Sequence, residues 1–216
     1  MLTQKRDYTK ILIVEGGDDK HSVISLMKKH TDWPEKGQYP VWVEVGSSVE
    51  QILEPGYLTT EIKASKVRIV GVMLDADTQA HGRYQRVQQL CATIFPNLPT
   101  HMPEGGLVVD NEDKRFGLWL MPDNTSEGAL ETFLRHLVPD HKEALWKQAC
   151  DSVTAAISAG AECRGNHVPK ANLYTWLAWQ DPPGQSPGLA LIRQILDPHS
   201  KHAEAFVSWF KQLYQV

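Results

Sequence analysis

Short runs of consecutive hydrophobic residues alternate with amphipathic stretches in the first two thirds of the chain. Such runs are typical of strands buried on both faces, and they lie at 11–15, 40–45, 66–74, 107–109 and 116–121. Segments with helical spacing lie between them, beginning at Asp18 or Asp19 and recurring at 49–53, 58–64 and 83–95. This alternation predicts an α/β fold with a mainly parallel sheet flanked by helices.

The strand patterns stop at about Glu127. The remaining apolar positions have helical spacing and are separated by Gly and Pro residues, which predicts helices at 127–138, 140–159, 170–179, 187–196 and 201–214. We therefore expect two parts. The first is an α/β domain over residues 1–138, and the second is a helical C-terminal extension over residues 139–216 that packs on it.

Acidic residues stand where two of the hydrophobic runs end. Glu15 closes the first run, and Asp75 and Asp77 follow the third. Because the carboxyl ends of parallel strands meet at one edge of the sheet, we expect these side chains to converge. Carboxylates packed together repel one another unless a cation lies between them, and hard oxygen ligands suit Mg²⁺ or Mn²⁺. The sequence predicts a divalent-metal site.

A second group of acids is expected at the same edge. Asp19, near Glu15, is a further metal ligand expected at the site. The second group consists of Glu127 and Glu131, which are four residues apart and would share a helix face, and of Asp123, which precedes them after the fourth strand. These residues could hold a second ion, and two ions can stabilise both oxygens of a phosphodiester cleavage. The alternative is that the acids favour the dipole of a helix amino terminus, which would explain Glu127 better than Glu131.

Basic residues that could meet a phosphate lie in two places. His81 and Arg83 follow the Asp-x-Asp turn and could hold the scissile phosphate, although a helix cap is the plain alternative. Lys170 could stabilise developing negative charge, and Tyr174 and Trp176 beyond it could stack a base, although such aromatics are more often core residues.

The order strand, Glu15-Gly16, helix, strand, helix, strand, Asp75-x-Asp77 resembles the Toprim domain. This domain is the catalytic fold of topoisomerases, of primases, of the overcoming-lysogeny-defect nucleases and of the ribonuclease that matures 5S rRNA. The resemblance covers roughly residues 8–135. It implies that Glu15 takes part in acid/base chemistry or shares the metal, and that Asp75 and Asp77 hold magnesium.

A closer resemblance is to small stand-alone Toprim-like proteins of uncharacterised function. It is carried by 117–124, by Gly128 and Leu130-Glu131, and in the tail by Lys170-Ala171 and 174–178. The tail therefore belongs to the same unit. This kinship states no substrate.

The expected function is that of a Mg²⁺- or Mn²⁺-dependent nuclease or phosphotransferase that uses one or two ions on phosphodiester bonds of DNA or RNA. Two alternatives remain: a non-catalytic nucleic-acid-binding Toprim module and a metal-dependent phosphatase. A haloacid-dehalogenase-type phosphatase fits worse, because that class carries its Asp-x-Asp motif on the first strand. A receiver domain also fits worse, because it has two adjacent acids at the end of the first strand, where this chain has Glu15-Gly16-Gly17. The resemblance also suggests a partner ATPase.

Composition restricts the possible classes of protein but does not indicate a function. The net charge is −4, but six of the acids belong to the predicted site, so a nucleic-acid partner remains compatible with it. The three cysteines form no Cys-x-x-Cys pair and indicate neither a disulfide framework nor a zinc module. The charged amino terminus and the absence of a long apolar run predict a cytoplasmic protein without a membrane span.

Overall fold

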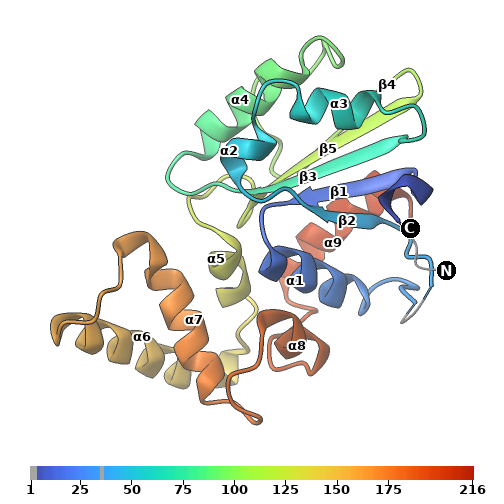
Figure 1. Cartoon of the computed structure of the whole chain (residues 1–216). Helices are drawn as coiled ribbons and strands as arrows, with labels where there is room; N and C mark the ends of the chain where they lie inside the picture. Colours follow the sequence, from blue (N-terminus) through green and yellow to red (C-terminus); the bar gives the residue numbers. More distant parts are fainter. Residues whose placement is uncertain (1–3, 35–36) are drawn as a thin grey trace.

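The structure is built on one five-stranded sheet in the order β2-β1-β3-β5-β4 (Figure 1). A computed structural model describes residues 4–34 and 37–216. The strands are β1 (Lys10–Val14), β2 (Trp42–Val45), β3 (Ile69–Asp75), β4 (Leu107–Asn111) and β5 (Lys114–Met121). The first three strands and β5 are parallel, and β4 pairs antiparallel with β5. The predicted α/β fold with a mainly parallel sheet is confirmed.

Helices follow β1, β2, β3 and β5, a turn joins β4 to β5, and the described elements of the tail are all helical. Their bounds are α1 (Gly17–Met27), α2 (Val49–Ile52), α3 (Tyr57–Lys63), α4 (Ala80–Cys91), α5 (Leu130–Arg135), α6 (Glu143–Ser158), α7 (Val168–Ala178), α8 (Pro187–Ile192) and α9 (Lys201–Tyr214). Short 3₁₀ turns lie at Lys5–Asp7, Asp140–Lys142 and Gly165–His167. In the part of the chain that these elements cover, we find no helix long and apolar enough to cross a membrane.

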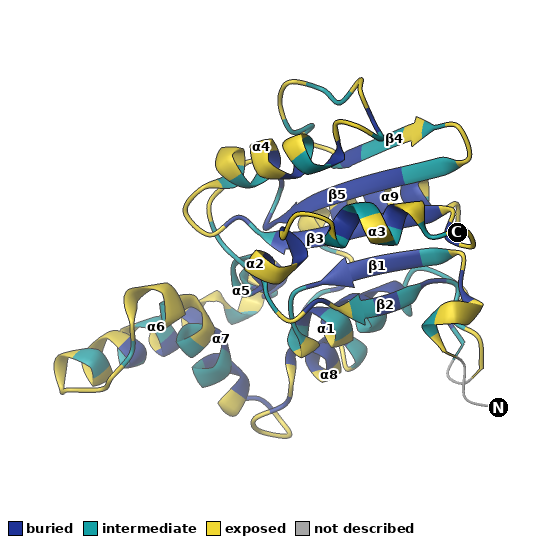
Figure 2. Cartoon of the chain, turned by 45° about the horizontal axis from the view of Figure 1, so that its top comes forward, coloured by how far each residue is buried: buried dark blue, intermediate teal, exposed yellow. Residues whose placement is uncertain are grey.

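The two faces of the sheet are covered by different helices. Alternate residues of a strand point to opposite faces, so Leu12 and Val14 join the core formed with α1, α5, α7, α8 and α9. Ile11 and Ile13 instead join the core formed with α2, α3 and α4. The central strands are buried along almost their full length (Figure 2). Such burial explains why the strands appear in the sequence as unbroken hydrophobic runs.

Helix α9 packs directly against the sheet. The Tyr214 hydroxyl donates to the Ile11 carbonyl at 2.8 Å, and the indole N–H of Trp209 donates to the Leu107 carbonyl at 3.0 Å. A Cβ atom on Gly71 would lie 2.2 Å from the Tyr214 hydroxyl, so glycine at this strand position permits the close approach. One core therefore runs from the sheet into residues beyond 138, while α6 and α7 extend away from the sheet (Figure 1).

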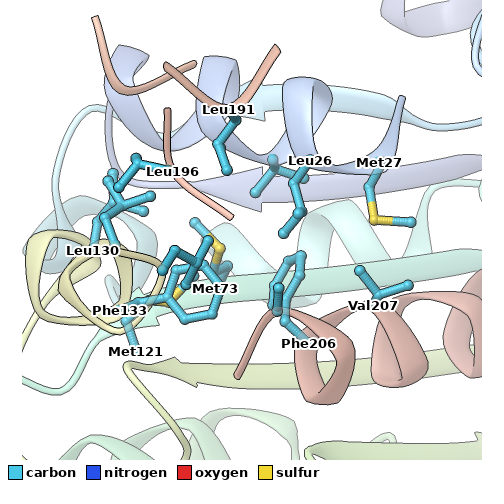
Figure 3. Close-up of a cluster of buried hydrophobic side chains, with 14 of the residues drawn as sticks. Leu26, Met27, Met73, Met121, Leu130, Phe133, Leu191, Leu196, Phe206 and Val207 are labelled. Atoms are coloured by element: carbon cyan, nitrogen blue, oxygen red, sulfur yellow. The ribbon is translucent and has the colours of Figure 1, made fainter. Parts of the chain in front are cut away.

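Helix α5 is shorter than expected and begins at Leu130 rather than Glu127. The reason lies in Gly128, which has φ +139° and pairs with Asp77 through two backbone hydrogen bonds of 2.8 Å. Leu130 and Phe133 then anchor the helix among Met73, Met121 and other buried side chains, as Figure 3 shows. This anchoring fixes Glu131, which follows Leu130, at the edge of the sheet.

Candidate functional site

A cavity of about 330 Å³ opens at the carboxyl ends of β1 and β3. We call it the acidic cavity, because five of its lining side chains are carboxylates and one, Lys170, is a cation. Its lining residues are Glu15, Gly16, Gly17, Asp18, Asp19, Ser47, Ser48, Asp75, Leu130, Glu131 and Lys170. Glu15 and Asp75 thus line one cavity at the sheet edge, where the strand-end rule for parallel sheets predicts that they meet.

Glu15 and Asp75, which both line this cavity, are linked by a hydrogen bond from a backbone N–H to a side chain. The Asp75 N–H donates to Glu15 Oε1 at 2.7 Å, and the Leu130 N–H donates to Asp75 Oδ1 at 2.9 Å. These two bonds tie the ends of β1 and β3 to the first residue of α5. Among the described residues, the second oxygen of each carboxylate has no hydrogen-bond partner, and both residues line the cavity.

Asp19 enters the cavity from the first turn of α1. Its Oδ2 accepts a hydrogen bond from the Gly16 N–H at 3.0 Å, which satisfies a donor at the amino terminus of the helix. The side chain is buried. A capping role and a ligand role are compatible, because the cap uses one oxygen of the carboxylate.

The three central carboxylates hold protons more tightly than free side chains do. Burial is the main cause, and it raises the pKa of Asp75 to about 8, that of Glu15 to about 7 and that of Asp19 to about 6. The charges of neighbouring acids add to the rise, with Glu15 and Asp19 acting on Asp75. At neutral pH the metal-free site is therefore partly protonated, and a cation would relieve the same repulsion.

Asp77 does not line the acidic cavity, although it was expected to meet Glu15 and Asp75 there. It adopts a left-handed conformation with φ 51°, and its Oδ2 lies 2.5 Å from Arg83 Nη2. The turn carries its carboxylate into an adjoining hollow on the α4 side. Its charge still raises the pKa of Glu15, so the two groups remain electrostatically coupled.

Three further residues that the sequence singled out lie outside the acidic cavity. Glu127 is exposed in the loop before α5, so the argument that it shares a helix face with Glu131 is wrong. Asp123 accepts hydrogen bonds from Thr125 and Ser126 within its own turn. His81 is exposed, with its ring 6.2 Å from that of His101.

The helical tail brings Lys170 to the acidic edge, as the sequence suggested. Lys170 stands in the first turn of α7, and its Nζ lies 3.4 Å from Asp18 Oδ2 and 3.5 Å from Glu131 Oε1. Burial lowers the pKa of this ammonium group, but the two carboxylates outweigh that effect and raise it. Lys170 is thus a cation at neutral pH, while Trp176 is a fully buried core residue.

Sequence reasoning missed several members of the cavity. Asp18, considered only as a helix cap, accepts a hydrogen bond of 2.8 Å from the Tyr174 hydroxyl and so links α1 to α7. Ser47 and Ser48 follow β2, and the strand-end rule that selected Glu15 would have selected them as well. The contact between Asp18 and Tyr174 joins residues 156 positions apart and carries no local signal.

The donor set fits a hard divalent cation. Glu15 and Asp75 each have one oxygen fixed by a backbone N–H and one oxygen left over, an arrangement that orients carboxylates for ligation. Within residues 4–34 and 37–216, no three His, Cys, Asp or Glu side chains lie close enough together to coordinate one metal ion as they stand.

Comparison with known proteins places the chain in a family. The profile of the family described as "Protein of unknown function (DUF3226)" matches residues 9–215. The chain belongs to the DUF3226 family. The match runs from β1 to the end of α9, so the family definition includes the tail that carries Lys170. Searches of curated proteins and of solved structures gave no match.

Proposed function

We propose that this DUF3226 protein is a divalent-metal-dependent nuclease or phosphotransferase that acts on phosphodiester bonds of nucleic acid. The observation that carries the proposal is the acidic cavity, in which Glu15, Asp19 and Asp75 converge with raised pKa values. Buried carboxylates with raised pKa values destabilise a fold, and such groups are typical of functional sites. The Toprim-like order of Glu15 and Asp75 agrees with the proposal.

The residues divide by role. Glu15, Asp19 and Asp75 would hold Mg²⁺ or Mn²⁺, with Asp77 within electrostatic reach and Glu131 available to a second ion. When bound, the metal supplies charge stabilisation at the phosphate and lowers the pKa of water. Glu15 Oε1 is held by the Asp75 N–H, so its other oxygen could accept a proton from the attacking water or hydroxyl.

Lys170 supplies the positive charge that the carboxylates lack. A polyanion approaching five carboxylates meets repulsion, and the ammonium group of Lys170 lies beside two of them at the rim of the cavity. Its half-exposed Nζ can leave Asp18 or Glu131 for a phosphate oxygen. In the transition state it would stabilise the charge that develops on that oxygen.

The direct test incubates the purified protein with Mg²⁺ or Mn²⁺ and labelled single- and double-stranded DNA and RNA. We expect cleavage of at least one of these polymers, abolished by chelation. Hydrolysis confined to a small phosphomonoester would favour a phosphatase, and binding of a strand without any metal-dependent cleavage would favour a non-catalytic module. Either result would remove the proposed function.

Lys170→Ala is expected to lower turnover by about a hundredfold, because one charged group that stabilises a transition state has an effect of this order. Turnover is measured under saturating substrate, and stability is measured by urea unfolding. Stability should change little, since the side chain is half exposed. Lys170→Arg should restore part of the activity.

Lys147→Ala is the matched control for this variant. Lys147 is an exposed lysine on α6 that pairs with Asp151 at 2.7 Å, so the control also breaks a surface ion pair of the tail. It should keep full turnover. Equal activity of the wild type and Lys170→Ala would limit the tail to a structural role.

A further inference from the structure

A second hollow, of about 340 Å³, adjoins the acidic cavity and has the opposite character. We call it the arginine hollow, because Arg83 and Arg86 line it together with Thr78, Gln79 and Gly82. Asp77 is the one acidic residue in its described lining. The hollow therefore carries excess positive charge in a chain whose net charge is −4.

The two guanidinium groups are held in different ways. Arg83 is largely buried and points Nη2 at Asp77 Oδ2, 2.5 Å away. Arg86 is exposed, and its Nη2 donates to the Leu53 carbonyl at 3.2 Å. A guanidinium has five donors, so both groups retain N–H donors for an anion. Thr78 and the amino-terminal turn of α4 add polar groups to the same lining.

The hollow lies next to the acidic cavity along the chain and in space. Asp75 lines the cavity and Asp77, two residues later, lines the hollow. Asp77 of the hollow also pairs through its backbone with Gly128, two residues before Leu130 of the acidic cavity. The charges of Arg83 and Asp77 both influence Glu15, which confirms that the two depressions are electrostatic neighbours.

We propose that the arginine hollow binds a phosphate that neighbours the one being cleaved, which makes the substrate a nucleic-acid strand with successive phosphates. This inference rests on the proposed function and adds a second phosphate-binding site for the same strand. Arginine forks match phosphate oxygens in pairs, and phosphate contacts position a strand without reading its sequence. The incoming phosphate takes Arg83 from Asp77, so in the free protein Asp77 acts as an internal competitor for the site.

If Asp77 competes with the phosphate for Arg83, substitutions of Arg83 and of Asp77 should change the affinity for a strand in opposite directions. The experiment measures binding of a short labelled single-stranded DNA by fluorescence anisotropy, without metal and at several salt concentrations. Every protein tested also carries Asp75→Asn, so that the strand stays intact. Arg83→Gln should weaken binding about tenfold and reduce the salt slope by about one, as should Arg86→Gln. Asp77→Asn, which frees Arg83, should instead tighten binding about threefold to tenfold.

Arg68 and Asp113 provide the matched control. They form an exposed arginine–aspartate ion pair. Arg68 precedes β3 and Asp113 lies between β4 and β5, so the pair stands at the opposite end of β3 from the hollow. Arg68→Gln should leave the salt slope unchanged, and Asp113→Asn should leave the affinity unchanged. The inference is overturned if Arg83→Gln matches Arg68→Gln, or if Asp77→Asn binds no tighter than Asp113→Asn.

Two further outcomes separate the hypotheses. A nucleoside diphosphate also carries two phosphates, and its displacement of the strand at equal concentration would overturn the assignment to a strand. If the expected pattern holds but the wild type cleaves no nucleic acid with Mg²⁺ or Mn²⁺, the proposed function falls and the phosphate site stands.

Discussion

Asp75→Asn is expected to lower metal-dependent cleavage by about a thousandfold or more, because Asp75 lines the acidic cavity and is one of the three carboxylates proposed to hold the metal. Asparagine has the same size, and its side-chain oxygen can still accept the hydrogen bond that the Leu130 N–H donates at 2.9 Å. The variant therefore loses a charge while keeping the link between β3 and α5. Initial rates with Mg²⁺ and with Mn²⁺ measure the effect.

Asp110→Asn is the control for this prediction. Asp110 is an exposed aspartate of β4 that pairs with Arg115 at 2.7 Å, outside both the acidic cavity and the arginine hollow. Its replacement should keep full activity. Substantial cleavage by Asp75→Asn, close to that of Asp110→Asn, would exclude Asp75 as an essential metal ligand.

The metal-free protein is expected to lose stability as the pH rises from about 5 to about 8. The folded-state pKa values of Asp19, Glu15 and Asp75 are about 6, 7 and 8, against ordinary values of 3.8 for Asp and 4.5 for Glu. Because these pKa values are raised, the folded protein binds more protons than the unfolded chain in this window. The stabilisation is complete below the ordinary values and is lost as the pH passes the folded-state values.

Urea unfolding at pH 5 and pH 8 in the presence of a chelator measures this loss, which should be on the order of a few kcal/mol. Asp75→Asn should reduce the loss and should be more stable than the wild type at pH 8, since it removes a charge that is buried without a counter-ion. Adding Mn²⁺ should restore the wild type at pH 8 and affect the variant less. The electrostatics of the site would be contradicted if neither the wild type nor Asp75→Asn changed its free energy of unfolding between pH 5 and pH 8.

Glu15 and Asp75 could be placed from the sequence because buried strands leave a strong local signal. Each follows an unbroken hydrophobic run, and in a parallel sheet the ends of such runs meet. Lys170 was expected to stabilise negative charge at a phosphate, and the structure places it in the lining of the acidic cavity. The positions of Glu15 and Asp75 depend on the order of elements rather than on the conformation of a single residue, whereas that of Lys170 depends on how α7 packs.

Asp77 and Glu127 show where this reasoning stops. The left-handed φ of Asp77 turns its carboxylate toward Arg83, and the paired backbones of Asp77 and Gly128 delay the start of α5 beyond Glu127. Both outcomes depend on one turn whose geometry a hydrophobic pattern does not encode. The pairing of Asp18 with Tyr174 likewise depends on how α7 packs, which is decided by tertiary contacts alone.

The central claim, that Glu15, Asp19 and Asp75 hold a divalent cation, is tested most directly by calorimetric titration of Mn²⁺ at pH 7 in two buffers of different ionisation enthalpy. Because Glu15 and Asp75 are partly protonated at this pH, metal binding should release on the order of one proton, and Asp75→Asn should weaken binding strongly and reduce the release. Absence of binding, or binding that releases no proton and is unchanged in Asp75→Asn, would contradict the account.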